Sequence, residues 1–209
     1  MKILIPTYNR SSKLQRTLEY YSLAMSSLDS FVVLDGSSDV YAEENEKICN
    51  IFGVEWLGYD QSLGLYERLL TYLENTCPSD LVVVANDEDV FLPSYLERAE
   101  SFMLKNSEYS GYIGRYITFA RPLLWFKRIS HARDFVTCID IGFNDPIRRL
   151  SLCSSTLLAG CSPVYFSIRR RLQLVESLHA QMSMRYESTK ELTDQAHLAL
   201  SGKLYFSKE

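Results

Sequence analysis

The sequence lacks the cysteine spacing of a disulfide framework or of a zinc site. Its five cysteines are odd in number, widely spaced and form no CxxC pair, whereas disulfide-rich domains and zinc sites use paired cysteines. We therefore interpret the cysteines as reduced thiols of a cytoplasmic protein. The three histidines are also scattered along the chain, and we interpret each as a surface or packing residue.

Long apolar runs and an excess of positive charge are also missing. No apolar stretch approaches the roughly 20 residues of a membrane-spanning helix, and the amino terminus enters a predicted strand rather than a signal peptide. The net charge of -4 argues against general nucleic-acid binding. With 209 residues, of which 46% are hydrophobic and 23% charged, the chain is expected to form one soluble globular domain.

Two glycine-rich phosphate-binding motifs are absent. There is no GxGxxG after the first predicted strand, and neither GxxxxGKS nor GxxxxGKT occurs in the chain. NAD binding in a Rossmann loop and ATP binding in a P-loop therefore lose their main support. A diphosphate bound by this chain would have to be neutralised mainly by a metal ion.

Apolar and polar residues alternate in the pattern of successive strands and helices. Short runs rich in β-branched residues predict strands at residues 2–7, 31–34, 54–57 and 81–85, with helices between them. Capping boxes of the form S-x-x-Q or S-x-x-E predict helix starts at Ser12, Ser94 and Ser188. A βαβ series of this kind favours an α/β fold with a mostly parallel sheet.

The strand at residues 81–85 runs directly into the acidic segment Asn86-Asp87-Glu88-Asp89. Three successive carboxylates repel one another unless water or a cation compensates their charge. Asp87 and Asp89 point the same way if the chain stays extended, and carboxylate oxygens suit Mg²⁺ or Mn²⁺. The segment therefore predicts a clamp for a divalent cation, with a solvated acidic turn as the alternative.

Polar clusters follow three of the predicted strands, at residues 6–10, 35–39 and 86–89. In an open α/β sheet, ligands bind outside the carboxyl ends of the strands. The three clusters are therefore expected to share one ligand site.

The residue types in the first two clusters suit a nucleotide. Tyr8 can lie against a base or ribose, and Arg10 can bind a phosphate. Asn9 and Asp35 offer the donor and acceptor that a uracil edge requires. The alternative is that both segments are ordinary turns, because Pro, Gly, Ser and Asp are typical turn residues.

Three segments in this order, ILIPTYNR, VVLDGSSD and VVVANDEDVFLPSYLE, resemble the nucleotide-diphospho-sugar transferases of the GT-A fold. The resemblance is to family 2-like glycosyltransferases with a D-x-D motif. It implies a single Rossmann-like α/β domain whose mostly parallel sheet is flanked by helices. It also implies a nucleotide-sugar-binding half at residues 1–110, an acceptor-binding half at residues 111–209, and a bound Mn²⁺ or Mg²⁺.

The family pattern assigns roles to individual residues of this chain. It places Asp35 at the base, Asp87 near the ribose or sugar, and Asp89 on the metal, where the acidic clamp adds Asp87 as a second ligand. Arg68 lies where family members often carry an arginine facing the nucleotide, although the asparagine common beside it is Leu69 here. The residues expected to bind the nucleotide are Pro6, Thr7, Tyr8, Asn9, Arg10, Asp35, Arg68 and Asp87.

An inverting transfer needs a carboxylate that takes the proton from the acceptor hydroxyl. Glu191 is the first candidate for this base, Asp194 the second and Asp145 a distant third. The segment Ser188-Thr189-Lys190-Glu191 is itself a capping box, so an equally supported alternative is that Glu191 starts a helix.

The stretch at residues 115–133 mixes arginine and lysine with Trp125 and Phe126. One interpretation is a surface that grips an anionic, lipid-linked acceptor or touches a membrane. The other, which we favour, is a pair of strands at the sheet edge or a lid.

These observations together predict a metal-dependent, inverting glycosyltransferase. It would move a sugar from a nucleotide diphosphate donor, which the resemblance implies is a UDP-sugar, to a glycan or lipid-linked acceptor in surface polysaccharide or glycoconjugate synthesis. The QxxRW motif of processive synthases is absent, so a chain-polymerising enzyme is not expected. The alternatives are a sugar nucleotidyltransferase, which should have a glycine-rich, basic first loop, and a non-catalytic nucleotide-sugar-binding relative.

Overall fold

A computed structural model describes residues 1–114, 117–120, 131–134, 141–157 and 164–207. Strands and helices alternate through most of the chain, as the sequence predicts. In order they are β1 (Lys2–Thr7), α1 (Ser11–Ala24), β2 (Phe31–Asp35), α2 (Asp39–Phe52), β3 (Glu55–Gly58), α3 (Leu65–Asn75), β4 (Leu81–Val84), α4 (Pro93–Lys105), β5 (Tyr109–Ile113), β6 (Ile117–Ala120), β7 (His131–Asp134), α5 (Pro146–Leu157), β8 (Ile168–Arg170), α6 (Arg171–Met182), α7 (Glu187–Ser201) and β9 (Lys203–Phe206).

The main sheet has seven strands in the order β3-β2-β1-β4-β8-β5-β9. The first four strands along the chain run parallel to one another. β8 is antiparallel to both β4 and β5, and β9 is parallel to β5. The expected mostly parallel α/β sheet is confirmed, and the carboxyl ends of β1, β2 and β4 meet at one edge.

The apolar runs of the central strands are explained by burial on both faces of the sheet. All five residues of β2 are buried. In β1, Ile3 and Ile5 pack on one face and Leu4 packs on the other. Successive side chains of a strand point to opposite faces, so a strand covered on both sides needs an unbroken apolar sequence.

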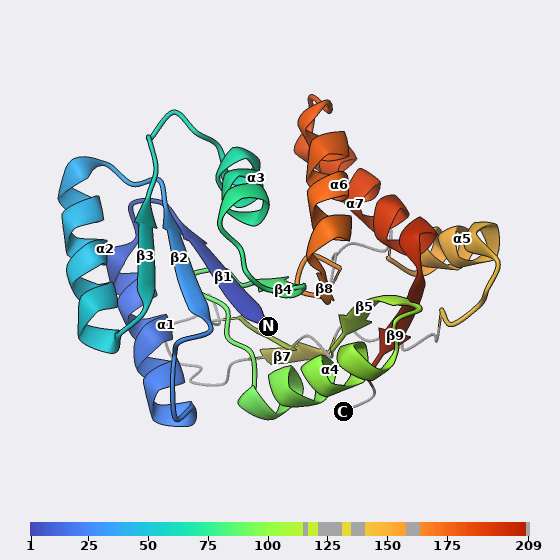
Figure 1. Ribbon diagram of the computed structural model, residues 1–209, viewed down its shortest axis with the longest axis horizontal. Coiled ribbons are helices and arrows are strands. Elements are labelled where there is room, and N and C mark those ends of the chain that lie inside the picture. Colours follow the sequence, from blue (N-terminus) through green and yellow to red (C-terminus); the bar gives the residue numbers. More distant parts are fainter. Residues whose placement is uncertain (115–116, 121–130, 135–140, 158–163, 208–209) are drawn as a thin grey trace.

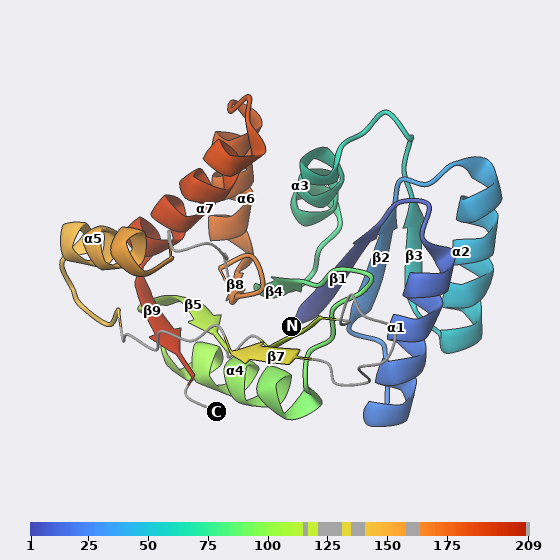
Figure 2. The same ribbon diagram turned by 180° about the vertical axis from the view of Figure 1, so that it is seen from behind.

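Helices cover the two faces of the sheet (Figure 1, and from behind in Figure 2). On one face, α1, α2 and α4 contribute Leu18, Cys49 and Ala99 to the core. On the opposite face, α3 and α6 contribute Leu69 and Leu174. α7 packs against α5 and α6. The layers therefore form a single domain with a helix–sheet–helix architecture, as expected.

Three helix starts differ from the predicted capping boxes. α1 begins at Ser11, α4 at Pro93 and α7 at Glu187, and none of them has a side-chain hydrogen bond at its N-cap. Proline suits the first helical position because its φ is already fixed near the helical value, so α4 begins one residue before the predicted serine. Glu191 lies in the second turn of α7 and therefore does not serve as a capping residue.

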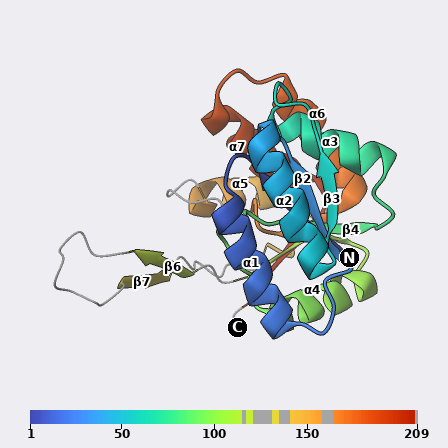
Figure 3. The same ribbon diagram turned by 90° about the vertical axis from the view of Figure 1, so that its left-hand side faces the viewer.

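The basic and aromatic stretch at residues 115–133 is described only in part. β6 and β7 pair antiparallel, with Ile117 opposite Asp134, and stand apart from the main sheet (Figure 3). The expected pair of strands is confirmed, but it is a separate two-stranded sheet rather than an edge of the main one. Trp125 and Phe126 lie outside the described residues.

Two expectations drawn from composition concern the cysteines and membrane spans. Cys49 and Cys77 are free thiols, whereas Cys138 and Cys161 lie outside the described residues. Within the part of the chain that the structure describes, none of the helices combines the length and apolarity needed to cross a membrane.

Candidate functional site

The loops after β1 and β2 are tied together by Asn9. Its φ is 54°, in the left-handed region that asparagine tolerates better than most residues. In this conformation its amide oxygen accepts a hydrogen bond from the Ser38 backbone nitrogen at 2.9 Å. Its own backbone nitrogen donates to Ser37 Oγ at 2.8 Å. The structure thus brings the first two predicted clusters together and assigns Asn9 to holding their loops.

Asp35 is buried at the end of β2 and its carboxylate is occupied by protein donors. It accepts hydrogen bonds from the Ser37 backbone nitrogen at 2.8 Å, Asn45 Nδ2 at 2.9 Å and Trp56 Nε1 at 3.1 Å. A carboxylate has about four acceptor positions, so little capacity remains for a ligand. The structure therefore shows Asp35 organising the loop, and sequence reasoning missed Asn45 and Trp56 because neither belongs to a motif.

Arg68 links the carboxyl ends of β1 and β2 through hydrogen bonds. Its side chain comes from α3, is only 5% exposed, and donates from Nη1 to the carbonyl oxygens of Thr7 at 2.7 Å and Leu34 at 2.8 Å. Burial lowers the pKa of its guanidinium, against the nearby charge of Asp35. A Cβ atom at Gly36 would lie 2.8 Å from Arg68 Cζ, so glycine is needed for this close approach.

The acidic segment after β4 does not stay extended. Residues 87 and 88 form a turn, so Asp87 and Asp89 do not point the same way as they would in an extended strand. Asp87 is buried and accepts a hydrogen bond from Thr7 Oγ1 at 2.8 Å. Asp89 instead accepts one from Asn86 Nδ2 at 2.8 Å. The predicted pair of carboxylates is therefore not presented as one clamp.

Protein cations compensate the charge of the acidic turn. Arg10 Nη1 lies 3.5 Å from both Asp87 Oδ1 and Glu88 Oε1, and Lys13 forms an ion pair with Glu88. The hydrogen bond from Lys13 lowers the pKa of Glu88. Arg10, expected at a phosphate, is thus bound to the acidic turn in this structure.

The residues at this edge fit a divalent cation only in part. No group of three or more His, Cys, Asp or Glu side chains suited to a metal ion occurs among the described residues. Asp87 does not fit, because its carboxylate is turned inward onto Thr7. Asp89 is half-buried and Asn86 Nδ2 bonds one of its oxygens, so it could supply one ligand to a cation that a bound diphosphate also coordinates.

Two residues near the carboxyl end of β1 differ in their exposure to solvent. Pro6 is buried within β1, in register with Leu34, and shapes the strand end rather than facing solvent. Tyr8 is 50% exposed, which leaves its ring free to contact a ligand. Tyr8 and Arg10 are therefore the exposed members of the predicted nucleotide set.

The base candidates occupy very different surroundings. Asp194 is buried in α7 and accepts hydrogen bonds from Arg169 Nη1 at 2.6 Å, Arg169 Nη2 at 3.0 Å and Ser177 Oγ at 2.7 Å. Burial opposes its ionisation, but the Arg169 charge and these donors outweigh burial and lower its pKa. Glu191 is exposed on α7. Asp145 caps α5 by accepting a hydrogen bond from the Ile147 backbone nitrogen at 2.9 Å.

The first turns of α7 and α3 are held together beside the sheet edge. Tyr66 donates its hydroxyl to Glu187 at 2.9 Å, and Lys190 Nζ lies 4.5 Å from the centre of the Tyr66 ring. Spacings of three and four residues place Glu187, Lys190, Glu191 and Asp194 on one face of α7. That face contacts α3 through Glu187 and Lys190 and contacts Arg169 of β8 through Asp194.

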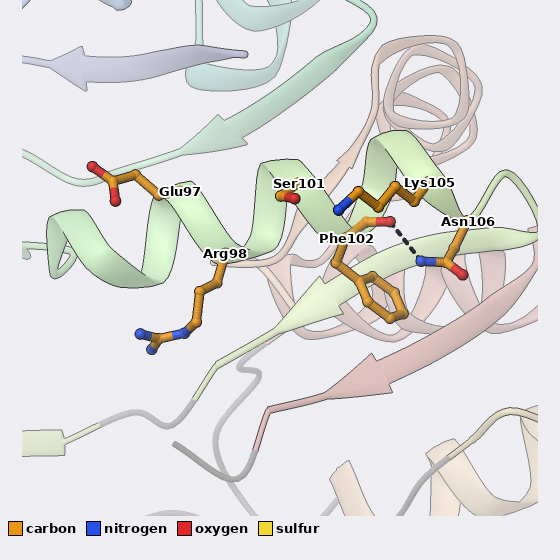
Figure 4. Close-up of a pocket in the computed structure, with 6 residues that line it drawn as sticks. All are labelled: Glu97, Arg98, Ser101, Phe102, Lys105 and Asn106. Carbon is orange, nitrogen blue, oxygen red and sulfur yellow. Dashed lines mark hydrogen bonds between the residues drawn. The ribbon is translucent and has the colours of Figure 1, made fainter.

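A surface hollow of about 410 Å³ lies elsewhere, along α4 (Figure 4). Its lining comes from one helix and the residue that follows it, where Asn106 Nδ2 donates to the Phe102 carbonyl oxygen at 2.8 Å. None of the predicted nucleotide, metal or base residues contributes to it. The lining residues are Glu97, Arg98, Ser101, Phe102, Lys105 and Asn106.

Comparison with known proteins identifies the architecture of this chain. No family model and no curated protein matches the sequence. A solved structure of S. aureus TarS residues 1–349 has a TM-score of 0.64 and 17% identity, and the match covers 100% of this chain and 58% of that chain. The chain has a GT-A-like fold.

Two further solved structures share the fold, and the match covers a larger share of their own chains. CMP:2-keto-3-deoxy-manno-octonic acid synthetase, solved with CTP, has a TM-score of 0.56 and 9% identity, and the match covers 99% of this chain and 88% of that chain. The 4-diphosphocytidyl-2C-methyl-D-erythritol synthase of Anaerococcus prevotii has a TM-score of 0.52 and 10% identity over the same shares, 99% and 88%. At these identities, the likeness concerns the fold.

Proposed function

We propose that this chain is a glycosyltransferase that transfers a sugar from a nucleotide diphosphate donor, a UDP-sugar, to a hydroxyl of a glycan or lipid-linked acceptor. The proposal rests chiefly on one observation: three polar loops and a buried arginine converge at the carboxyl edge of β1, β2 and β4. This edge is where ligands of open α/β sheets bind.

The observed contacts support a preorganised donor site. Asn9 fixes the loops after β1 and β2 to one another, and Thr7 fixes the first loop to Asp87 of the acidic turn. Arg68 adds a buried positive charge behind the same strand ends. A site held by protein hydrogen bonds loses less conformational freedom when the donor binds. The exposed Tyr8 ring would then lie against the base or ribose.

A divalent cation, Mn²⁺ or Mg²⁺, would neutralise the developing charge of the departing diphosphate. We assign Asp89 to hold it, with donor phosphate oxygens as further ligands. Arg10 would leave its 3.5 Å contacts with the acidic turn and bind a phosphate of the donor, because its side chain is half-exposed.

We assign the acceptor base to Glu191. It is exposed, has no capping duty, and lies on the face of α7 that is turned toward α3 and β8. Asp194 is a weaker candidate because four hydrogen bonds and a buried arginine stabilise its charged form, and a carboxylate with a lowered pKa is a poorer proton acceptor.

A sugar nucleotidyltransferase is the second candidate. Two fold neighbours are named after cytidine nucleotides, CMP in one name and diphosphocytidyl in the other, and the first was solved with CTP. Such a reaction would have to bind a triphosphate at the first loop, which in this chain is Thr7-Tyr8-Asn9-Arg10 and contains no glycine. We therefore rank glycosyl transfer first.

The direct test is a thermal-shift panel of UDP, GDP, CDP, ADP and CTP, each with and without Mn²⁺. A ligand at a hundredfold excess over its dissociation constant adds about 2.7 kcal/mol, which raises the melting temperature of a domain of this size by about 5 to 10 °C. We expect the largest rise with UDP and Mn²⁺. Release of UDP from UDP-sugars is then measured on the same protein.

The matched variants are Asp89→Asn and Glu88→Gln. Both remove one charge from the same turn, but Glu88 pairs with Lys13 and has no assigned metal role. Loss of the Mn²⁺-dependent rise in Asp89→Asn alone is the expected result. A rise with CTP and release of pyrophosphate would favour nucleotidyl transfer, and no rise with any nucleotide would refute the donor site.

A further inference from the structure

Two hydrogen-bond donors near the candidate site are buried without partners. Among the described residues, Arg68 Nε and the Tyr165 hydroxyl have no hydrogen-bond partner, although both atoms are screened from water. A buried polar group without a partner is uncommon in folded proteins and calls for an explanation such as a missing ligand. Neither donor is used by the contacts that shape the loops.

The two donors come from opposite halves of the chain, and the same core cluster lies next to Tyr165 and to α3, which carries Arg68. Tyr165 packs partly against the cluster that contains Leu34 and Leu69, the neighbour of Arg68. Burial raises the pKa of Tyr165, and the Arg169 and Arg68 guanidinium groups oppose that rise. Tyr165 in turn contributes to the electrostatic environment of Arg68.

The turn that carries Tyr165 is rigidly held. Arg169 Nη2 donates to the Val164 carbonyl oxygen at 2.6 Å, while the same guanidinium is paired with Asp194. The next residue, Phe166, lies edge-on to Phe91, with ring centroids 6.3 Å apart. The buried pair therefore holds the tyrosine beside the segment that follows the acidic turn.

We propose that the Tyr165 hydroxyl and Arg68 Nε together bind a phosphoryl oxygen of the nucleotide diphosphate, with Arg169 and Asp194 acting as positioning residues for Tyr165. This inference rests on the proposed function and names a donor-binding residue from the second half of the chain, which was expected to bind only the acceptor.

The chemistry of the two donors selects an anionic oxygen. Both groups donate, and the Arg68 guanidinium carries a positive charge whose printed hydrogen bonds go to backbone carbonyl oxygens and not to a carboxylate among the described residues. Charge-assisted hydrogen bonds of this kind are stronger than neutral ones, so a phosphate satisfies the pair better than a sugar hydroxyl. Because both atoms are screened from water, binding must be accompanied by side-chain rotamer changes, which are common at interfaces.

The test compares Tyr165→Phe with the matched control Tyr72→Phe. The Tyr72 hydroxyl is also buried without a partner, in the same core cluster, but its neighbours include Cys77 and Glu55 and it has no role in the proposed donor contacts. Dissociation constants for UDP in Mn²⁺ are measured by calorimetry, and those for uridine by displacement of UDP. Phenylalanine fills the same space, so both variants are expected to fold, and their melting temperatures are measured alongside.

We expect Tyr165→Phe to weaken UDP binding about tenfold to a hundredfold, the range for a hydrogen bond to a charged group, and to leave uridine binding unchanged. Tyr72→Phe should bind both ligands as the wild type does. Equal losses for UDP and uridine, or no loss for UDP, would overturn the inference while leaving the donor site intact. Failure of the wild type to bind any nucleoside diphosphate would instead overturn the proposed function.

Discussion

The buried ion pair between Arg169 and Asp194 yields the most demanding prediction about this chain. Both side chains are almost fully buried, at 3% and 9% exposure, and the guanidinium donates twice to the carboxylate. Replacing Asp194 by asparagine keeps the shape but leaves the Arg169 charge without its counter-ion. Removing one partner of a buried pair typically costs about 3 to 5 kcal/mol.

That loss is large compared with the total stability of a domain, which is about 5 to 15 kcal/mol. For a chain of this length, each kcal/mol corresponds to about 2 to 4 °C, so Asp194→Asn should lower the melting temperature by about 6 to 20 °C. Urea unfolding followed by circular dichroism at pH 7 measures the free energy itself. We expect the midpoint to fall without a change in the slope.

The same experiment separates a structural role from a catalytic one. Loss of transfer in an Asp194→Asn protein that remained as stable as the wild type would support Asp194 as the acceptor base. A loss of less than about 1 kcal/mol would refute the account of the buried pair. A double variant, Asp194→Leu with Arg169→Met, removes both charges and should recover most of the lost stability, because replacing a whole buried pair by apolar residues is often nearly neutral.

Three further predictions follow from individual contacts. The pKa of Asp194 is lowered in the folded state, so the ionised carboxylate stabilises the fold fully above the unfolded pKa of about 3.9. This stabilisation is lost as the pH falls through the pKa of the folded state. Urea midpoints measured between pH 2 and 7 should show the loss in the wild type and not in Asp194→Asn. Gly36→Ala would place a Cβ 2.8 Å from Arg68 Cζ and should cost about 1 to 3 kcal/mol, with weaker UDP binding by calorimetry; unchanged binding would contradict the tight packing. Glu191→Gln should change stability by less than about 0.5 kcal/mol, retain UDP binding and slow transfer by about 10² to 10⁴; unaltered transfer would exclude Glu191 as the base.

The fold was predictable because burial leaves a mark on local sequence. β1 occupies the predicted residues 2–7, and β2 extends the prediction by one residue, Asp35. A strand covered on both faces must be apolar throughout, so its sequence is distinctive. Helix starts were less predictable, because a serine followed by Glu or Gln occurs both at caps and within the first turn, as around Ser94 and Ser188.

The contacts of the site were predictable only where they are local. Motifs located the three loops, since each follows a strand directly. Nothing in the sequence indicates that Asn45 and Trp56 bond to Asp35, or that Arg169 pairs with Asp194 across 25 positions. The same limit applies to the acidic turn, because Arg10 and Lys13, the cations that compensate its charge, are more than 70 positions away in the chain.

The two halves of the chain hold their charges in different ways, and this difference bears on how a donor could bind. Arg10 is half-exposed and lies 3.5 Å from Glu88, which is also exposed, and exposed pairs of this kind contribute about 0 to 1 kcal/mol. Moving Arg10 from Glu88 to a phosphate therefore costs little. The Arg169–Asp194 pair is buried and cannot exchange partners at a comparable cost. The site would thus combine a rearrangeable first loop with a fixed turn at Tyr165, so that donor binding is accommodated by the first half against a surface that the second half holds in place.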